Sequence, residues 1–408
     1  MKAERNFPKF IITAKGTKWV EQGHPWIYAA EVVREEGGCE NGGLADAVSE
    51  KGKYLGTGFV SRESKIRLRL ISRNANDRFD EAFWRRRIQY AWDYRKTVMG
   101  SDISCCRVFF GEADGFPGLT VDRFSDILVT QTLSVGIERI KPMLFPLLAK
   151  VLREDGQDIR GIYQRNDVAI RALEGMEQNK GWFLLPGETP PEQAVTEICE
   201  NGIFYRVDVE NGQKTGFFLD QKQNRAGIAP FCRDARVLDC FCHNGSFSLH
   251  AAKYGAKSVL GVDISEDALE VARENARRNG LENVTFEAHN CFDHLRALSD
   301  AGEKFDLVIL DPPAFTKSKN TVPAALRGYK EINLRGLKIV RPGGYLVTCS
   351  CSQHVSTEMF QQMVNEAVRD AKVRVRMIEY RTQGYDHPIL PAAPETKYLK
   401  CMYLQVLD

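Results

Sequence analysis

The sequence has no long hydrophobic run and almost no excess of charge of either sign. No apolar stretch approaches the roughly 20 residues that a membrane-spanning helix needs. The opening residues, MKAERNFPKFIITAKG, lack the apolar core of a signal peptide. Lysine and arginine number 56 against 54 aspartate and glutamate, so no global field attracts a polyanion. These absences predict a cytoplasmic protein without a membrane partner, in which any nucleic-acid-binding face is local.

The cysteines lack the arrangement of a disulfide framework or of a zinc site. There are 11 of them, an odd number scattered along the chain, which favours reduced thiols. Two pairs have CxC spacing, at Cys240 and Cys242 and at Cys349 and Cys351. The sequence contains no two CxxC pairs, however, and we therefore expect no bound metal.

The chain is too long for one domain. Its 408 residues exceed the roughly 250 to 300 at which a single hydrophobic core stops growing. Hydrophobic residues make up 43% and charged residues 27%, which is ordinary for globular proteins and excludes a mostly disordered or fibrous chain. Changes in sequence pattern predict three domains, at residues 1–75, 76–192 and 193–408.

Residues 1–75 are predicted to form a small β-rich domain. Short apolar runs broken by glycine, such as YLGTGFV and IRLRLIS, are typical of strands. In the second run Lys65, Arg67 and Arg69 alternate with aliphatic residues, so a strand would place three cations on one face. That face is either simply solvated or a stripe that contacts phosphates.

Residues 76–192 mix helices and strands. The segments FDEAFWRRRIQYAWDYRKTVM and IKPMLFPLLAKVL have the periodicity of helices. Between them, VFFGEADGFPGLTVDRFSDILVTQTL predicts strands separated by Gly, Asp and Pro turns. The PGETPPEQ segment at 186–193 is predicted to be a linker or a surface loop.

Residues 193–408 alternate strands with helices, which favours a doubly wound α/β fold with a seven-stranded sheet. The strands are expected in ARVLDCF, SVLGVDIS, NVTFEAHN, FDLVILDPP and GGYLVTCSCS. A helix should follow Ser265, whose side chain can cap its N-terminus. The last two apolar runs, KVRVRMIEY and KCMYLQVLD, fit an antiparallel pair at one edge of the sheet.

A glycine and an acidic residue at successive strand ends indicate an adenosyl ligand. Gly245 follows the first strand and would let the backbone approach a ligand closely. Asp263 ends the second strand, where a carboxylate can accept hydrogen bonds from both ribose hydroxyls. The turn is not a G-x-G-x-x-G motif, which disfavours a dinucleotide. S-adenosylmethionine, an adenosyl ligand without a pyrophosphate, fits this pattern.

Two further strand ends carry groups suited to covalent chemistry. Asp311 precedes two prolines, which stiffen the backbone and fix the direction of the carboxylate. Cys351 lies in TCSCS at the end of the next strand and, if it faced Asp311, would add a nucleophile to the methyl-donor site. The alternatives are a merely rigid strand exit and a cysteine that only packs.

At this point the sequence resembles a known family. Residues from about 200 to 408 look like the class I methyltransferase domain of the bacterial 23S rRNA (cytosine-C5) methyltransferases of the RlmI type. HPWIY at 24–28 is similar to the start of their PUA-like domain. FGEADGFPGLTVDRF at 110–124 and QRNDVAIRALEG at 164–175 resemble their central α/β domain, and TGFFLDQKQNR at 215–225 precedes their catalytic sheet.

The resemblance implies roles for individual residues at the S-adenosylmethionine site. In this family the matching residues lie beside the donor or line its pocket: Asp220, Arg225, Phe241, Gly245, Phe247, Asp263 and Asp311. Asn290 stands where relatives usually carry an aspartate near the adenine amine. An amide oxygen accepts a hydrogen bond as a carboxylate does, so we expect adenine binding to survive this departure.

The resemblance also implies the reaction. Cys351 would add to C6 of cytosine and so activate C5, while Asp311 would hydrogen-bond or protonate N3. Cys349 is either an accessory catalytic thiol or a packing residue, and it is expected to face the same side of the strand as Cys351. The target base must be unstacked, which favours single-stranded or loop RNA, and Phe315 and Tyr329 are either stacking platforms or core residues.

The implied partner is 23S rRNA or a large-subunit assembly intermediate, and the family also implies a possible homodimer. Two other functions stay open from the residues. The same scaffold could methylate guanine N7 or adenine N6, which needs no thiolate because nitrogen lone pairs attack directly. A non-catalytic RNA-binding factor could instead keep the sheet only as a scaffold, and it would bind no S-adenosylmethionine.

Overall fold

The structure is a computed structural model that describes residues 6–408, so the first five residues of the predicted N-terminal domain lie outside the described residues. The chain divides into two compact units. The N-terminal unit comprises residues up to 198 together with 207–219 and 385–396, and the C-terminal unit comprises 199–206, 220–384 and 397–408. No helix within residues 6–408 is long and apolar enough to cross a membrane.

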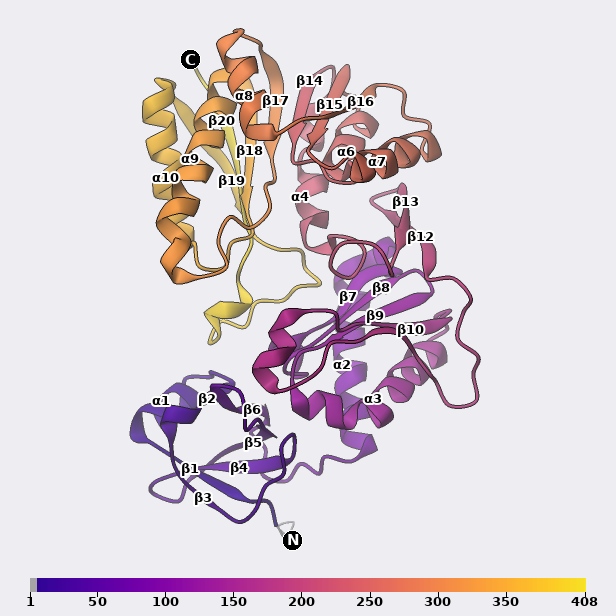
Figure 1. The fold of residues 1–408 in the computed structure, drawn as a ribbon, viewed down its shortest axis with the longest axis vertical. Helices are drawn as coiled ribbons and strands as arrows, with labels where there is room; N and C mark the ends of the chain where they lie inside the picture. The colour runs from indigo at the N-terminus through magenta and orange to yellow at the C-terminus, as the bar shows by residue number, and fades with distance from the viewer. Residues whose placement is uncertain (1–5) are drawn as a thin grey trace. The chain divides into compact units, whose positions relative to one another are not determined.

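The predicted β-rich domain is confirmed as a six-stranded sheet at the start of the N-terminal unit (Figure 1). Its strands, in the order β2-β6-β5-β4-β1-β3, are β1 (Lys9–Ile12), β2 (Trp26–Tyr28), β3 (Val32–Glu36), β4 (Leu44–Ser49), β5 (Tyr54–Val60) and β6 (Ile66–Ser72). Helix α1 (Ala14–Glu21) is capped by the Thr13 side chain. Phe10, Val20 and Leu68 are fully buried in the core of this sheet.

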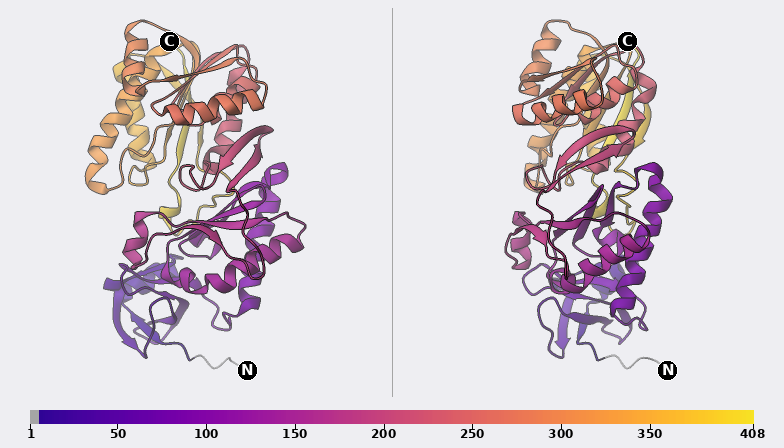
Figure 2. Two further views of the ribbon diagram at one scale, coloured as in Figure 1. Left: turned by 45° about the vertical axis from the view of Figure 1, so that its right-hand side comes forward. Right: turned by 90° about the vertical axis from the view of Figure 1, so that its right-hand side faces the viewer.

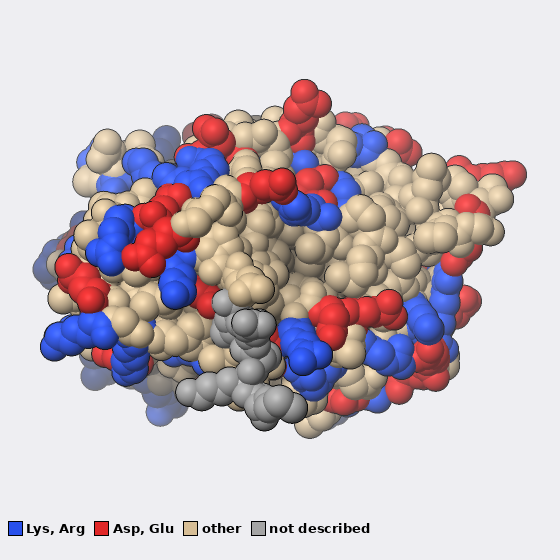
Figure 3. All heavy atoms as spheres, turned by 90° about the horizontal axis from the view of Figure 1, so that it is seen from below, with Lys and Arg blue, Asp and Glu red and all other residues tan. Residues whose placement is uncertain are grey.

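Two of the three cations in the predicted stripe, Arg67 and Arg69, have a structural role that neither interpretation anticipated, while Lys65 precedes β6 and is exposed. Arg69 forms ion pairs with Glu112 at 3.0 Å and Glu174 at 3.1 Å, and only 12% of its side chain is exposed. Arg67 donates to the backbone carbonyls of Ser61 and Arg62. The prediction of a solvated or phosphate-binding face is therefore wrong for Arg69. In the space-filling view of Figure 3, basic and acidic side chains are interspersed and form no single large basic patch.

The central region has a five-stranded sheet in the order β11-β10-β9-β8-β7. The strands are β7 (Cys105–Phe110), β8 (Leu119–Phe124), β9 (Ile127–Thr132), β10 (Gly161–Arg165) and β11 (Lys180–Phe183). The two predicted helices are confirmed as α2 (Glu81–Met99) and α3 (Val135–Glu154). Residues 186–193 form an exposed loop, as predicted, ahead of β12 (Val195–Glu200), which pairs with β13 (Ile203–Asp208).

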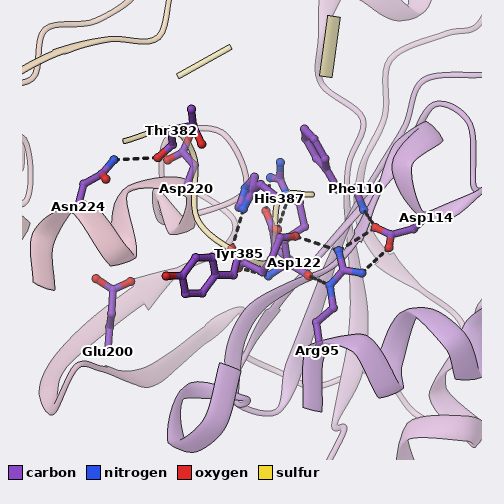
Figure 4. Close-up of polar contacts among 12 residues, drawn as sticks. Arg95, Phe110, Asp114, Asp122, Glu200, Asp220, Asn224, Thr382, Tyr385 and His387 are labelled. Carbon is purple, nitrogen blue, oxygen red and sulfur yellow. Dashed lines mark hydrogen bonds and ion pairs between the residues drawn. The ribbon is translucent and has the colours of Figure 1, made fainter. Parts of the chain in front are cut away.

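A late segment of the chain is anchored in the N-terminal unit by buried polar contacts. Arg95 on α2 is fully buried and donates to both carboxylate oxygens of Asp114 (Figure 4). Arg95 also donates to the Asp386 carbonyl at 2.9 Å, and the Asp386 carboxylate accepts from the Arg107 N–H at 2.8 Å. Asp114 lies in the FGEADGFPGL motif, so this motif serves a structural purpose.

The C-terminal unit contains the predicted seven-stranded sheet, in the order β16-β15-β14-β17-β18-β20-β19. The strands are β14 (Arg236–Cys240), β15 (Ser258–Asp263), β16 (Val284–Ala288), β17 (Phe305–Leu310), β18 (Val340–Ser350), β19 (Val375–Arg381) and β20 (Lys400–Val406). The first five are parallel, and β20 pairs antiparallel with both β18 and β19. This topology confirms the Rossmann-like class I methyltransferase fold.

Helices cover both faces of this sheet (Figures 1 and 2). They are α4 (Lys222–Gly227), α5 (Ala229–Cys232), α6 (Ser246–Lys253), α7 (Glu266–Arg278), α8 (Cys291–Asp300), α9 (Val322–Ile339) and α10 (Thr357–Ala371). Alternate residues of β17 pack into opposite layers, with Val308 and Leu310 beneath α8 to α10 and Leu307 and Ile309 on the side of α5 and α6. Because both faces are buried, the central strands are continuously apolar.

Candidate functional site

The order of the strands reverses between β14 and β17, and the carboxyl ends of the parallel strands share one edge there. Open α/β sheets bind ligands at this edge. The chain leaves β14 through a turn with positive φ at Phe241 (64°), His243 (50°) and Gly245 (77°). A side chain on Gly245 would place its Cβ 2.9 Å from the Phe286 ring, so both the conformation and the packing require glycine.

Asp239 is a buried carboxyl group at this edge with one unsatisfied oxygen. Its Oδ2 accepts the Ser248 hydroxyl at 2.6 Å, while its Oδ1 has no hydrogen-bond partner within residues 6–408. Burial raises the pKa of Asp239 to about 7, and the negative charges of Asp311 and Asp263 act in the same direction. A buried acceptor without a protein donor can accept a hydrogen bond from a ligand. Our sequence reasoning did not single out Asp239, although its position at a strand end could have drawn attention to it.

Asp263 ends β15, as predicted, and shapes the adjacent turn. Its Oδ2 accepts the N–H of His243 at 2.9 Å and its Oδ1 accepts the N–H of Ser265 at 3.0 Å. Each carboxylate oxygen keeps a further lone pair, so Asp263 can still accept hydrogen bonds from a ligand. Asn290 caps α8 by accepting the Phe292 N–H at 2.9 Å, and its side chain is exposed.

The two phenylalanines of the predicted set have different environments. Phe241 is half-buried and lies edge-on to Phe292 and Phe315, with ring centroids 6.2 and 6.4 Å apart. Phe247 is only 3% exposed and belongs to the core cluster beneath α5 and α6. Phe241 therefore retains a surface that a ligand could contact, while Phe247 contributes mainly to packing.

The predicted Asp220 and Arg225 lie at the start of the C-terminal unit and are both buried. Arg225 forms a two-pronged ion pair with Glu200, with N···O distances of 2.6 and 2.9 Å. Burial alone lowers the pKa of Arg225, but the Glu200 carboxylate outweighs it and the pKa lies above its ordinary value. Asp220 accepts the Tyr398 hydroxyl at 2.6 Å. The guanidinium of Arg225 is thus occupied by an internal partner.

Asp311 follows β17 and is held by a chain of side-chain amides. Its Oδ1 accepts the Gln221 amide N–H at 2.8 Å, and the Gln221 oxygen accepts the Asn224 amide at 2.6 Å. Asn224 also donates to the Thr382 carbonyl at 3.2 Å (Figure 4). This chain fixes the direction of the Asp311 carboxylate at the edge of the sheet.

The two neighbouring cysteines of TCSCS differ in exposure. Strand β18 ends at Ser350, so Cys351 lies just beyond it, half-buried, with its Sγ 4.0 Å from the Pro312 carbonyl oxygen. Cys349 is fully buried opposite Cys401, and burial raises the pKa of the Cys349 thiol well above its ordinary value. Cys351 therefore does not share a strand with Cys349 as expected, and Cys349 has the environment of a packing residue.

The two aromatic residues predicted as stacking candidates also differ in their burial. Tyr329 is fully buried and its hydroxyl lies 2.9 Å from that of Ser352, which makes it a core residue. Phe315 is half-buried against Tyr329, with ring centroids 4.5 Å apart. Of the two, Phe315 alone has the exposed ring surface that a base could stack on.

Comparison with known proteins agrees with this geometry. A family model for S-adenosylmethionine-dependent methyltransferases matches residues 182–400, more than half of the chain, and a PUA-like model matches residues 10–73. A protein named ribosomal RNA large subunit methyltransferase I from Klebsiella pneumoniae is 38% identical over 404 residues, which cover 98% of this chain and 99% of that relative. The protein of the same name from Tolumonas auensis is 40% identical over 387 residues, 94% of this chain and 96% of the relative.

Solved structures show the same fold. A methyltransferase complexed with SAH has a TM-score of 0.82 at 20% identity, covering 98% of this chain and all of that one. A SAM-dependent methyltransferase from Streptococcus mutans has a TM-score of 0.80 at 21% identity with the same coverage. At this identity the likeness concerns the fold alone.

Proposed function

Because the chain belongs to the family of S-adenosylmethionine-dependent ribosomal RNA large subunit methyltransferases I, we propose that it forms 5-methylcytidine in 23S rRNA through a covalent bond between Cys351 and the base. The observation that carries the cytosine-C5 chemistry is the half-buried thiol of Cys351 beside the Asp311-Pro312 strand end. Nitrogen methylation would need no thiol at this position.

The residues at the carboxyl edge fit S-adenosylmethionine. The unsatisfied Oδ1 of Asp239 can accept a hydrogen bond from the ammonium group of the methionyl part. Asp263 would accept hydrogen bonds from the ribose hydroxyls, and Asn290 would accept one from the adenine amine. Gly245 gives the turn after β14 its positive φ and packs against Phe286, so it shapes the backbone at this edge. When bound, S-adenosylmethionine supplies an electrophilic methyl group at this edge.

Cys351 would act as the nucleophile. Its thiolate adds to C6 of cytosine, and as the C6–S bond forms the ring electrons shift so that C5 becomes a nucleophilic, enamine-like carbon. Asp311, fixed by Gln221, would hydrogen-bond or protonate N3 and so stabilise the adduct. After C5 has taken up the methyl group, a base removes the C5 proton, the C6–S bond breaks and the thiolate is released.

The test of this function is the identity of the methylated nucleoside. Labelled S-adenosylmethionine is incubated with the protein and deproteinised 23S rRNA, and the digested nucleosides are identified by mass spectrometry. We expect the label in 5-methylcytidine. Label in 7-methylguanosine or N6-methyladenosine would contradict the C5 chemistry, and absence of saturable donor binding in equilibrium dialysis would identify a non-catalytic factor.

Donor affinity should depend on pH through Asp239. Its carboxyl group must be ionised to attract the donor's cationic part, and burial raises its pKa to about 7. Protonation therefore competes with binding below neutrality, and the affinity should fall by about tenfold per pH unit below 7 and level off above 8. Calorimetric titration with S-adenosylmethionine from pH 5.5 to 8.5 measures this. The Asp239→Asn variant should bind S-adenosylmethionine weakly, with an affinity that does not change with pH. If the affinity of the variant still fell at low pH, another group would cause the pH dependence.

An acid-free segment beside the site is the best candidate for RNA contact. Residues 312–329 contain no aspartate or glutamate and carry the exposed cations Lys317, Lys319 and Arg327. None of the three forms an ion pair with any residue in the described part of the chain. The segment directly follows Asp311, so phosphates flanking the target base would lie near these cations.

Removing two of these cations should reduce the salt dependence of RNA binding. Each phosphate contact contributes about 0.7 to the slope of log affinity against log salt for single-stranded RNA. Lys317→Gln/Lys319→Gln should therefore lower the slope by about 1.4 in filter-binding titrations, with unchanged donor affinity. Lys257→Gln/Lys304→Gln, placed before the amino ends of β15 and β17, is the charge-matched control. Equal slopes for the two double variants would exclude this segment from the RNA interface.

A further inference from the structure

Lys400 is a buried cation that none of the roles above explains. It begins β20 and is only 3% exposed. Its Nζ donates to three backbone carbonyls, those of Ser352 at 2.7 Å, Val355 at 2.8 Å and Tyr398 at 2.8 Å. An ammonium group has three N–H donors, so all of them are in use and the protonated form is the one that fits.

No carboxylate neutralises this charge. Lys400 forms no salt bridge within residues 6–408, and burial lowers its pKa to about 8. A buried charge without a counter-charge is unfavourable and is rarely kept without a purpose. The negative charge of an ionised Cys351 opposes this effect of burial and raises the pKa of Lys400. The interaction between two titrating groups is mutual, so the ammonium must favour the Cys351 thiolate to the same extent.

The position of the cation singles out one thiol. Two of its three carbonyl partners, at Ser352 and Val355, lie in the turn that begins at Cys351. The backbone directly after the thiol is therefore tied to the cation. Cys349, at the end of the same strand, faces Cys401 instead, and its thiol is held neutral by burial.

We propose that Lys400 is a positioning residue for Cys351, in which its buried ammonium fixes the turn 351–355 and stabilises the thiolate that attacks the base. The inference rests on the proposed role of Cys351. The proton of the thiol passes to solvent, because Cys351 is half-exposed and every N–H of Lys400 is already donated. Lys400 therefore acts through its charge and not as an acid or base.

Other charged and titratable groups described near this pair come from neighbouring elements. Lys397 lies near Lys400 and lowers its pKa. Tyr329 packs from α9 and interacts with Cys351, while burial raises the pKa of Tyr329 and keeps it neutral. Asp311 lies at the neighbouring strand end and would oppose a thiolate. The positive charge of Lys400 thus offsets the negative charge of Asp311, which the site needs to bind N3 of the base.

The test measures thiol reactivity in the full chain without RNA. The rate of alkylation of Cys351 by iodoacetamide is followed against pH by mass spectrometry of its peptide, in the wild type, Lys400→Met and Lys400→Arg. In the wild type we expect the midpoint to lie below the ordinary thiol value of about 8.5. Lys400→Met should raise it by about one unit or more, which is about a tenfold slower reaction near pH 7, and Lys400→Arg should restore it in part.

Two results would overturn the proposal. One is an unchanged midpoint in a Lys400→Met variant whose circular dichroism and melting temperature match the wild type. The other needs no variant to fold: a wild-type midpoint at or above 8.5 would show that the cation does not bring the pKa of this thiol below its ordinary value, which the proposal requires. Neither result bears on whether Cys351 is the nucleophile, which the RNA product and the Cys351 variants decide separately.

Discussion

Cys351→Ala is expected to abolish 5-methylcytidine formation in 23S rRNA and to leave S-adenosylmethionine binding unchanged. Carbon C5 of cytosine is too weak a nucleophile to take a methyl group unaided, so the rate should fall on the order of 10⁴-fold or more when the thiol is removed. The thiol is half-buried at the sheet edge and lies outside the two core clusters described on either side of the sheet, so its loss should affect stability little. Radiolabel transfer and equilibrium dialysis measure the two effects.

Cys349→Ala is the matched control, because it removes the same group two residues earlier. Cys349 is fully buried against Cys401, so its replacement should lower stability moderately and preserve methyl transfer. If both variants lost activity while they still bound S-adenosylmethionine normally, Cys349 would also have a role in catalysis. An active Cys351→Ala enzyme would instead favour nitrogen methylation on the same scaffold.

A covalent adduct can also be trapped directly. RNA with 5-fluorocytidine at the target position cannot lose a proton from C5, so the C6–S bond should persist after methyl transfer. The wild type should then form a complex stable to denaturing electrophoresis, and Cys351→Ala should not. Both a covalent role of Cys351 and a role in base binding predict a loss of turnover in Cys351→Ala. Only the covalent role predicts a trapped complex with the wild type.

The sequence predicted those features that depend on neighbouring residues. The alternation of strands and helices after residue 193 gave the topology, and Ser265 caps α7 as expected by accepting the Ala268 N–H. Asp263, Asp311 and Cys351 were placed at one edge of the sheet because parallel strands end there together. For such residues the chain position alone determines the location.

Features that depend on distant residues were beyond such reasoning. Lys400 reaches the turn after Cys351 only because β20 pairs with β18, and no local pattern shows this. Arg69 belongs to an alternating cationic strand, yet its partners Glu112 and Glu174 come from other elements. A sequence pattern gives the face on which a charge lies, whereas its partner is determined by tertiary packing.

Arg225→Met should destabilise the protein more than any other single exchange considered. Arg225 and Glu200 are at most 1% exposed. The exchange would leave the buried Glu200 carboxylate with His250, whose ring lies 4.0 Å away and whose pKa burial lowers to about 3. Breaking such a pair by removing one partner is expected to lower the free energy of unfolding by about 3–5 kcal/mol. Urea titration of the full chain, followed by circular dichroism, measures this.

The double variant Glu200→Gln/Arg225→Met is the control, since it removes both charges together. It should recover much of the stability, because the unpaired charge and not the missing guanidinium causes most of the loss. A deficit that is equal in the single and double variants would assign the loss to packing.

The same variants decide what Arg225 does for the donor. The family resemblance places Arg225 beside S-adenosylmethionine. In the structure Arg225 lies on α4, the helix that follows Gln221, and its guanidinium pairs with Glu200 at the end of β12. A direct contact predicts that Glu200→Gln/Arg225→Met folds but binds the donor weakly. An indirect role, in which the pair holds α4 and thereby the Gln221 contact to Asp311, predicts normal donor affinity with reduced turnover. We expect the second result, because the guanidinium makes two hydrogen bonds to a buried internal carboxylate.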